Sequence, residues 1–418
     1  MKLNKYSFGI GDRFARQGLA QLLAFQKSVE KNLLITPVWN KSHREHKTVH
    51  STPQSVRNEA DEAVKVSGWE HEYRVDADHI NLTNVEEFID SSDFFTIDVA
   101  EYINSKVEEE EIEQFIKINS KFIGEIEIPS IPEPFYIDRD FLWHIGEKFL
   151  GAIMEAAKIY QYIKLKKGQS FIAEVSMDEV EEPQTPVELF MILSGLAQYG
   201  IEIQTIAPKF TGRFNKGVDY VGDVETFQKE FEEDLLVIDY AIREFNLPAN
   251  LKLSVHSGSD KFSIYESIHN TIKKHNKGVH VKTAGTTWLE ELAGLALSGR
   301  QGLDLAKEIY SKALNRYDEL TGPYATVIDI RRENLPQPKE VNRWDNIKFS
   351  QTLRHDQNNP NYNPEFRQLL HVAYKIAAES GNQFISLVNN NKDIIGPLVT
   401  ENIINNHIDP IFSGKKIV

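Results

Sequence analysis

Eight short apolar runs rich in β-branched residues constrain the fold of this chain more than any other feature. Parallel strands covered on both faces have this near-continuous apolar character. Segments with apolar residues at helical spacing separate most of the runs, and a strand–helix unit repeated eight times is typical of a (β/α)8 barrel. We expect strands at 7–11, 32–39, 72–80, 93–100, 170–177, 201–208, 251–258 and 278–285, and helices at 12–29, 52–66, 85–89, 141–166, 186–198, 224–246, 263–277 and 287–299.

The strand count favours an α/β fold of the TIM-barrel type over a doubly wound open sheet. The Gly9-Ile10-Gly11 run lacks the third glycine of a dinucleotide-binding loop, and no Walker A sequence occurs. We predict a catalytic barrel over residues 1–324, with a charged and then proline-rich inserted lobe at about 101–140, after the fourth strand. Residues 325–418, with a polar loop at 335–364 and helices at 365–380 and 393–407, are expected to form a C-terminal extension packed on the barrel.

Charge and composition exclude several classes of protein. The 418 residues carry a formal net charge of −15, which argues against a nucleic-acid partner. The absence of cysteine excludes disulfides, thiolate metal sites and a cysteine nucleophile. We see no secretory signal and no apolar run of membrane-spanning length, so we expect a cytoplasmic protein without a membrane partner. The sequence leaves a homo-oligomer open.

Polar and charged side chains cluster where the predicted strands end, and active sites of such barrels lie at that end. Charged groups there are costly to bury without partners, so their coincidence on seven of eight strands indicates an enzyme. They are Asp12, Arg13, Asn40, Lys41, Asp76, Asp78, His79, Asp98, Glu174, Ser176, Asp178, Glu179, Lys209, His256, Ser257, His280 and Lys282.

Two carboxylates are candidates for proton transfer. Asp78, in the cluster Asp76-Ala-Asp78-His79, is placed for acid–base work beside an imidazole. Alternatively, Asp78 caps the following helix and His79 is a solvated loop residue. Glu174 lies inside an apolar strand, where burial would raise its pKa and suit a general acid. Alternatively, it forms an ion pair with Lys209 or Lys282.

Three histidines near strand ends predict a metal site. His256 and His280 belong to neighbouring strands that can share one ion, and His79 is the third candidate ligand. Imidazoles with open water positions suit a divalent Zn, Mn, Ni, Co or Fe ion. The alternatives are that Ser257–Asp260 form a helix cap beside His256, and that His280 is an ordinary core residue.

The remaining candidates concern an anionic ligand. We expect substrate contacts from Arg13, Lys41, Arg44, Lys282 and Ser257, and support from behind the site by Asp76, Asp98 and His371. Lys209, Arg213 and Lys216 follow the sixth predicted strand, so a phosphorylated sugar also remains open. The histidine-rich run at 43–50 has no metal-box spacing and is predicted to be a solvated loop.

Several segments resemble the tagaturonate/fructuronate epimerase family: GIGDRFARQG (9–18), DADHI (76–80), FFTIDVAEYI (94–103), LSVHSGSDKFSIY (253–265), VKTAGTTWLE (281–290) and LLHVAYK (369–375). The resemblance implies a cytoplasmic, metal-dependent barrel enzyme that interconverts D-tagaturonate and D-fructuronate, epimers at C4, in hexuronate catabolism. It further implies Asp78 as proton acceptor, Glu174 as proton donor, and His79, His256 and His280 as ligands of the divalent metal.

The chemistry fits this set of residues. C4 is not adjacent to the C2 carbonyl, so inversion needs either cleavage and re-formation of the C3–C4 bond or sequential enolisation. Both routes use a Lewis acid, a base, an acid and a clamp for the carboxylate. The competing interpretations are a related epimerase, isomerase or aldolase acting on another ketose or sugar acid, a metal-dependent barrel hydrolase, and a non-catalytic carbohydrate-binding protein.

Overall fold

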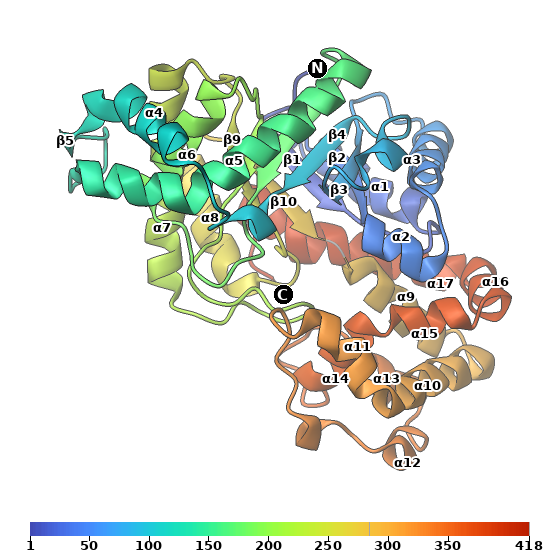
Figure 1. Ribbon diagram of the computed structural model, residues 1–418. Helices are drawn as coiled ribbons and strands as arrows, with labels where there is room; N and C mark the ends of the chain where they lie inside the picture. The colour runs from blue at the N-terminus through green and yellow to red at the C-terminus, as the bar shows by residue number, and fades with distance from the viewer. Residues whose placement is uncertain (284, 418) are drawn as a thin grey trace.

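The computed structural model describes residues 1–283 and 285–417 and contains a closed barrel of eight parallel strands (Figure 1). The strand order around the barrel is β1-β10-β9-β8-β7-β4-β3-β2. The predicted TIM-type barrel is therefore confirmed. Its strands are β1 (Tyr6–Ile10), β2 (Thr36–Ser42), β3 (Arg74–Ile80), β4 (Phe94–Asp98), β7 (Ile172–Ser176), β8 (Thr205–Ala207), β9 (Lys252–Val255) and β10 (Val279–Thr283).

The barrel helices lie close to their expected positions. One of them, α6, begins at Pro186, as predicted, because Thr185 and Glu188 form a capping box around that start. The helices are α1 (Gly18–Glu30), α3 (Pro53–Ser67), the 3-10 turn η1 (Val85–Phe88), α5 (Arg139–Lys167), α6 (Pro186–Gln198), α7 (Val224–Phe245), α8 (Phe262–Lys274) and α9 (Thr286–Leu297).

One barrel segment contradicts the sequence prediction. Residues 43–50, expected to be a solvated loop, contain the helix α2 (His43–Val49). A capping box begins this helix: Ser42 Oγ accepts a hydrogen bond from the backbone N–H of Glu45, and the Glu45 carboxylate accepts one from the backbone N–H of Ser42. This cap was not predicted from the sequence. The helix buries Glu45 and His46 instead of exposing them to solvent.

The segment between β4 and α5 forms small elements outside the barrel. It contains the 3-10 turns η2 (Ala100–Tyr102) and η3 (Ser120–Phe122), the helix α4 (Glu109–Asn119) and an antiparallel pair of strands, β5 (Gly124–Ile126) and β6 (Phe135–Ile137). In Figure 1 this segment lies on the side of the molecule away from the C-terminal helices.

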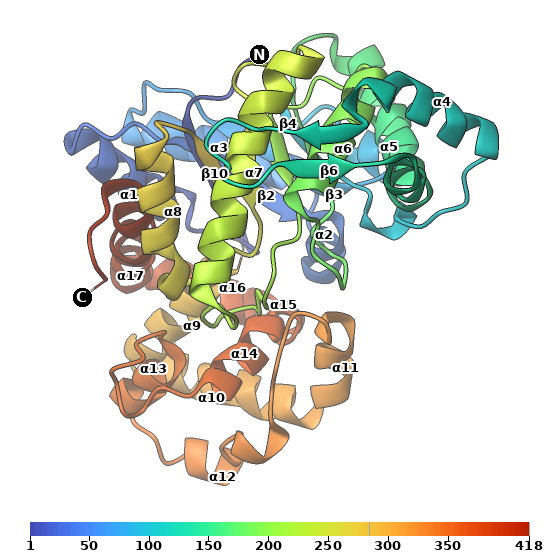
Figure 2. The same cartoon turned by 90° about the vertical axis from the view of Figure 1, so that its left-hand side faces the viewer.

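Short helices follow the last barrel unit and gather below the barrel in Figures 1 and 2. The predicted helix at 365–380 is divided at Ala373 into α14 and α15, and the one at 393–407 is α17 continued by a π-helix. The elements are α10 (Arg300–Asn315), α11 (Tyr317–Thr321), η4 (Gly322–Tyr324), η5 (Arg332–Asn334), α12 (Pro338–Val341), α13 (Asn346–Leu353), α14 (Pro364–Val372), α15 (Tyr374–Glu379), α16 (Asn382–Asn390), α17 (Lys392–Ile403) and η6 (Ile404–Ser413).

The extension is joined to the barrel by extensive packing, since α17 contacts α1 and α9 and η6 contacts α8. Residue 284, in the predicted eighth strand, and residue 418, at the end of the predicted extension, lie outside the described residues. Over the described part of the chain, no helix combines the length and the apolar character needed to cross a membrane.

Candidate active site

A cavity of about 270 Å³ opens at the carboxyl ends of the barrel strands. Because the polar residues predicted at strand ends converge there, the structure brings most of the candidate site together. Of the thirteen residues to which the sequence assigned a role in proton transfer, metal binding, substrate binding or support, nine line the cavity: Arg13, Arg44, Asp78, His79, Asp98, His256, Ser257, Lys282 and His371. Lys41, Asp76, Glu174 and His280 are buried behind its wall.

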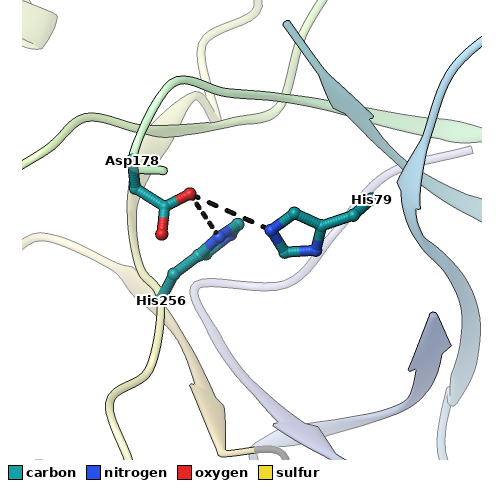
Figure 3. Close-up of side chains that lie close together, drawn as sticks. All are labelled: His79, Asp178 and His256. Atoms are coloured by element: carbon teal, nitrogen blue, oxygen red, sulfur yellow. Dashed lines mark ion pairs between the residues drawn. The ribbon is translucent and has the colours of Figure 1, made fainter. Parts of the chain in front are cut away.

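His79, Asp178 and His256 form a cluster that fits a divalent metal ion (Figure 3). One donor atom from each residue lies within 4.8 Å of the others. Asp178 Oδ1 is 3.0 Å from His256 Nδ1 and 4.0 Å from His79 Nε2. Two imidazoles and one carboxylate are a donor set that Zn, Mn, Fe or Co accepts, and three protein ligands leave positions for water or substrate.

An irregularity in β3 lets two consecutive side chains face the cavity. Successive residues of a regular strand point to opposite faces. Here the pairing of β3 with β4 shifts register between Ala77 and Ile80, and His79 has a left-handed backbone with φ of 54°. Such backbone is costly for a residue other than glycine, and it places both Asp78 and His79 on the cavity wall.

The cluster differs from the predicted trio of histidines. His280 is fully buried near the start of β10, where its Nδ1 lies 2.9 Å from Ser7 Oγ and its ring 5.4 Å from that of Phe94. Burial lowers the pKa of His280 to about 3, as expected for a core imidazole. The structure thus places Asp178, a strand-end residue that the sequence did not assign to the metal, where His280 was expected.

Lys282 lines the cavity, and three carboxylates surround its ammonium. Its Nζ lies 2.7 Å from Asp76 Oδ2, 2.8 Å from Asp78 Oδ1 and 3.1 Å from Glu174 Oε1. The three acids outweigh the effect of burial and raise the pKa of Lys282 well above its usual value. The ion pair between Glu174 and Lys282, which the sequence offered as an alternative, is confirmed, and the charge of Lys282 is already balanced by these acids.

The pKa of Glu174 is opposite to the prediction. Burial by itself would raise it, but the charges of Lys282 and His256 dominate and lower it well below its usual value. Glu174 Oε1 lies 2.7 Å from His256 Nε2, on the ring edge opposite Asp178. A carboxylate in this position fixes the orientation and tautomer of a metal-binding imidazole.

Asp78 is an ionised carboxylate at the cavity wall. Burial opposes ionisation, but Lys282 and His79 lower the pKa of Asp78 well below its usual value. Its Oδ1 lies 2.8 Å from Lys282 Nζ and 3.0 Å from His79 Nδ1. The alternative in which Asp78 caps the next helical turn is wrong, because Asn84 occupies the N-cap position of η1 and, among the described residues, no side chain caps that turn.

Three cations, Arg13, Arg44 and Lys216, also line the cavity. Arg13 Cζ lies 4.2 Å from the ring centre of Tyr374, Arg44 Cζ lies 4.8 Å from that of Tyr324, and the two tyrosine hydroxyls are 3.0 Å apart. Arg13 pairs with Glu45 at 3.1 Å, yet its buried Nε and Nη1 have no partner among the described residues. Lys216 Nζ lies 5.9 Å from the Tyr324 ring and also lines the cavity. Sequence reasoning considered Lys216 only for a phosphate.

Lys41 supports this wall from behind. Its Nζ donates hydrogen bonds to the backbone carbonyl of Arg13 at 2.5 Å and to Ser51 Oγ at 2.9 Å, and Lys41, expected to contact the substrate, is not among the residues that line the cavity. Asp12 holds the same loop through hydrogen bonds from four successive backbone N–H groups, those of residues 14–17. Together these two buried groups fix the loop that carries the Arg13 guanidinium.

Of the three residues expected to support the site from behind, only Asp76 lies behind the cavity wall. Asp76 accepts hydrogen bonds from Thr96 Oγ1 behind the wall, and burial raises its pKa to about 7. Asp98 and His371 instead line the cavity. The Nδ1 atom of His371 is buried without a partner among the described residues.

Comparisons with known proteins identify the family of this chain. The tagaturonate epimerase family matches residues 1–409. The tagaturonate/fructuronate epimerase of Thermotoga maritima is 28% identical over 381 residues, which cover 88% of this chain and 72% of that protein.

Solved structures show the same fold. The fructuronate–tagaturonate epimerase of Cohnella laeviribosi, in a complex with one glycerol, superposes with a TM-score of 0.82 at 23% identity over 98% of this chain and 82% of that one. Its native form gives a TM-score of 0.81 over the same shares. The family match spans almost the whole sequence, and the chain therefore belongs to the tagaturonate epimerase family.

Proposed function

We propose that this epimerase interconverts D-tagaturonate and D-fructuronate with the help of a divalent metal ion. The observation that carries the proposal is the presence, in the lining of one cavity, of a metal-type donor cluster, an ionised acid and a group of cations. A hexuronate with a keto group at one end and a carboxylate at the other can use both the donor cluster and the cations. The similarity to the tagaturonate/fructuronate epimerase of Thermotoga maritima supports the same substrate pair.

His79, Asp178 and His256 would hold the metal, and Glu174 would orient His256 from behind. A divalent ion at this position supplies a Lewis acid for the oxygens around the substrate carbonyl. Zn, Mn, Ni, Co and Fe are all compatible with the donor set. Lys282 keeps Asp78 and Glu174 ionised, since its ammonium lies within 3.1 Å of an oxygen of each.

Asp78 is the proposed base. Its ionised carboxylate lines the cavity and can take the proton from the hydroxyl at C4, after which the C3–C4 bond breaks to give an aldehyde and an enediolate. Rotation of the aldehyde and attack on its other face re-form the bond with inverted configuration, and Asp78 returns the proton to the new alkoxide. One base thus serves both directions, and Glu174 need not donate a proton.

Arg13, Arg44 and Lys216 are the proposed contacts for the substrate carboxylate, with Ser257 on the same cavity wall. Arg13 Nε and Nη1 are buried without a partner among the described residues, and a guanidinium is a side-chain group well suited to binding a carboxylate.

The metal site is tested by metal analysis and by an assay of D-tagaturonate conversion before and after EDTA. Asp178→Asn and His256→Gln should lose both metal and turnover, and His280→Gln, the matched control, should keep the metal. Retention of metal by Asp178→Asn together with its loss from His280→Gln would replace this ligand set with the trio of histidines.

The reaction route is tested in D2O. The proposed cleavage of C3–C4 leaves the hydrogen on C3 in place, whereas enolisation exchanges it with solvent. We expect the product to carry no deuterium at C3 by NMR, and deuterium at that carbon would refute the cleavage route.

A further inference from the structure

Two fully buried cations, Lys261 and Arg367, lie behind the cavity and take no part in the proposed chemistry. Lys261 Nζ donates hydrogen bonds to the backbone carbonyls of Asn215, Val218 and Ser259, each at 2.8 Å. It thereby joins the loop after β8, which carries Lys216, to the loop after β9, which carries His256 and Ser257.

Arg367, from α14 in the C-terminal extension, ties the same two loops together. Its Nε donates to the carbonyl of Gly217 at 2.6 Å, and its Nη2 contacts Asp260 Oδ2 at 2.7 Å. A third bond joins Nη1 to the carbonyl of Leu353 at 2.7 Å. The guanidinium therefore connects both loops to the extension.

The loop after β9 needs such support because its backbone is strained. Ser257 and Asp260 both have positive φ, 48° and 61°, although neither is glycine. This backbone conformation is unfavourable for a residue with a side chain, and it persists only where the surrounding contacts hold it in place. Asp260 is fixed further by a hydrogen bond from its backbone N–H to His407 Nε2, at 3.1 Å, in η6.

Asp260 is not the helix cap that the sequence offered as an alternative. Lys261 occupies the N-cap position of α8, and its side chain makes no capping hydrogen bond. The Asp260 carboxylate instead binds Arg367, and the Asp260–Arg367 pair is one of the polar links between the cavity wall and the extension, beside the contacts of Asp260 with His355 and His407.

We infer that Lys261 and Arg367 are positioning residues, and that the C-terminal extension acts through Arg367 to hold His256 and Lys216 in place for metal and substrate. This inference rests on the proposed metal site. It assigns the extension a role in catalysis instead of a role in packing alone. Loss of a group that orients a metal ligand lowers metal affinity about 10–100-fold in other proteins.

The test is a double variant, Asp260→Asn with Arg367→Gln. Removing Arg367 alone would leave the buried Asp260 carboxylate without its cation and destabilise the fold, whereas removing both charges avoids that cost. Metal-free protein is titrated with Mn²⁺ in equilibrium dialysis, and KM and kcat for D-tagaturonate are measured separately. We expect the double variant to bind Mn²⁺ at least tenfold more weakly than the unaltered protein and to have a higher KM. A cooperative thermal unfolding transition shows that the variant is folded.

The matched control is Arg316→Gln. Arg316 follows α10 and pairs with Glu319 and with Glu379 of the extension, and it does not line the cavity. Its Mn²⁺ affinity and KM should equal those of the unaltered protein. If the double variant does not fold, Arg367→Lys decides, because a lysine keeps the charge opposite Asp260 but cannot reach all three acceptors.

The outcomes separate the two proposals. An active, metal-binding protein whose folded double variant, or Arg367→Lys variant, has unchanged Mn²⁺ affinity and KM would overturn the positioning role and leave the proposed function intact. An unaltered protein that neither binds Mn²⁺ nor converts D-tagaturonate would overturn both.

Discussion

The replacement of Lys216 by methionine separates recognition of the substrate carboxylate from the rest of catalysis. Lys216 is near Arg13 and Arg44, and its ammonium makes no ion pair among the residues that the structure describes. Methionine keeps most of the aliphatic volume and removes only the charge. The variant therefore tests the cations that line the cavity without leaving a buried carboxylate unpaired.

The expected size of the effect follows from one charge-assisted hydrogen bond. Such a bond contributes about 1.5–3 kcal/mol, and each 1.4 kcal/mol is about a tenfold change in binding. KM for D-tagaturonate should therefore rise about tenfold to a hundredfold in Lys216→Met. D-Tagatose, which has a CH₂OH group in place of the carboxylate, should be converted at the same kcat/KM by both proteins.

Lys216→Met should weaken substrate binding but raise the thermal stability of the protein. Burial, with the neighbouring arginines, lowers the pKa of Lys216, so the charged ammonium is unfavourable in the folded state. At neutral pH the unfolded chain solvates this charge and the folded chain does not, so its removal should raise the thermal midpoint. A less active but more stable variant is typical of residues kept for function.

The assay follows both epimers by chromatography with each substrate, and Lys209→Met is the matched control. Lys209 also follows β8 but lines a neighbouring hollow and not this cavity. The reasoning is refuted if Lys216→Met leaves KM for D-tagaturonate unchanged, or if conversion of D-tagatose falls by the same factor.

Three further predictions concern buried charges and one glycine. Burial raises the pKa of Glu59 well above its usual value, so the folded state keeps its proton and the free energy of unfolding falls as pH rises above about 4.3, by at most about 1.4 kcal/mol per pH unit. Glu59→Gln should therefore raise the free energy of unfolding, measured in urea, by more at pH 8 than at pH 5. An equal increase at the two pH values would contradict this. Lys282→Met leaves three buried carboxylates without their cation and should cost about 3–5 kcal/mol in the same assay, so a stable variant would refute the charge balance. Gly285→Ala should destabilise by about 1–3 kcal/mol, because φ is +97° and the new Cβ would lie 2.3 Å from His371 Nε2; an unchanged midpoint would disprove this.

The barrel was predictable because buried parallel strands consist of nearly continuous runs of apolar residues, which can be seen in the sequence. The run at 170–177, for instance, contains β7, and Thr185-Pro186 marks the start of α6 where the structure has it. The helix α2 was not predictable from apolar spacing, since its stability rests on the cap between Ser42 and Glu45. The short helices of the extension similarly have too few turns to show a period.

Depth along a strand explains the errors in the site. His256 follows the last residue of β9, whereas His280 is the second residue of β10 and pairs with Ser7 and Ser254. The alternation of side chains along a strand shows which of them face the barrel axis. It does not show how far along the strand each one lies, and only those near the carboxyl end reach the cavity. Lys282 reaches it, but no sequence pattern shows that three acids from β3 and β7 surround its ammonium.

The net charge of the chain makes the local cations necessary for recognition of an acid. A formal charge of −15 repels an anionic substrate at long range, so the field of the whole protein cannot bring a hexuronate to the cavity. Attraction must arise at short range, where water is excluded and an unpaired guanidinium interacts strongly. The carboxylates around Lys282 are already neutralised in part by that lysine, which prevents them from repelling the ligand. Arg13, Arg44 and Lys216 are then the charges left to bind it, and selectivity for an acid over a neutral ketose should depend on them.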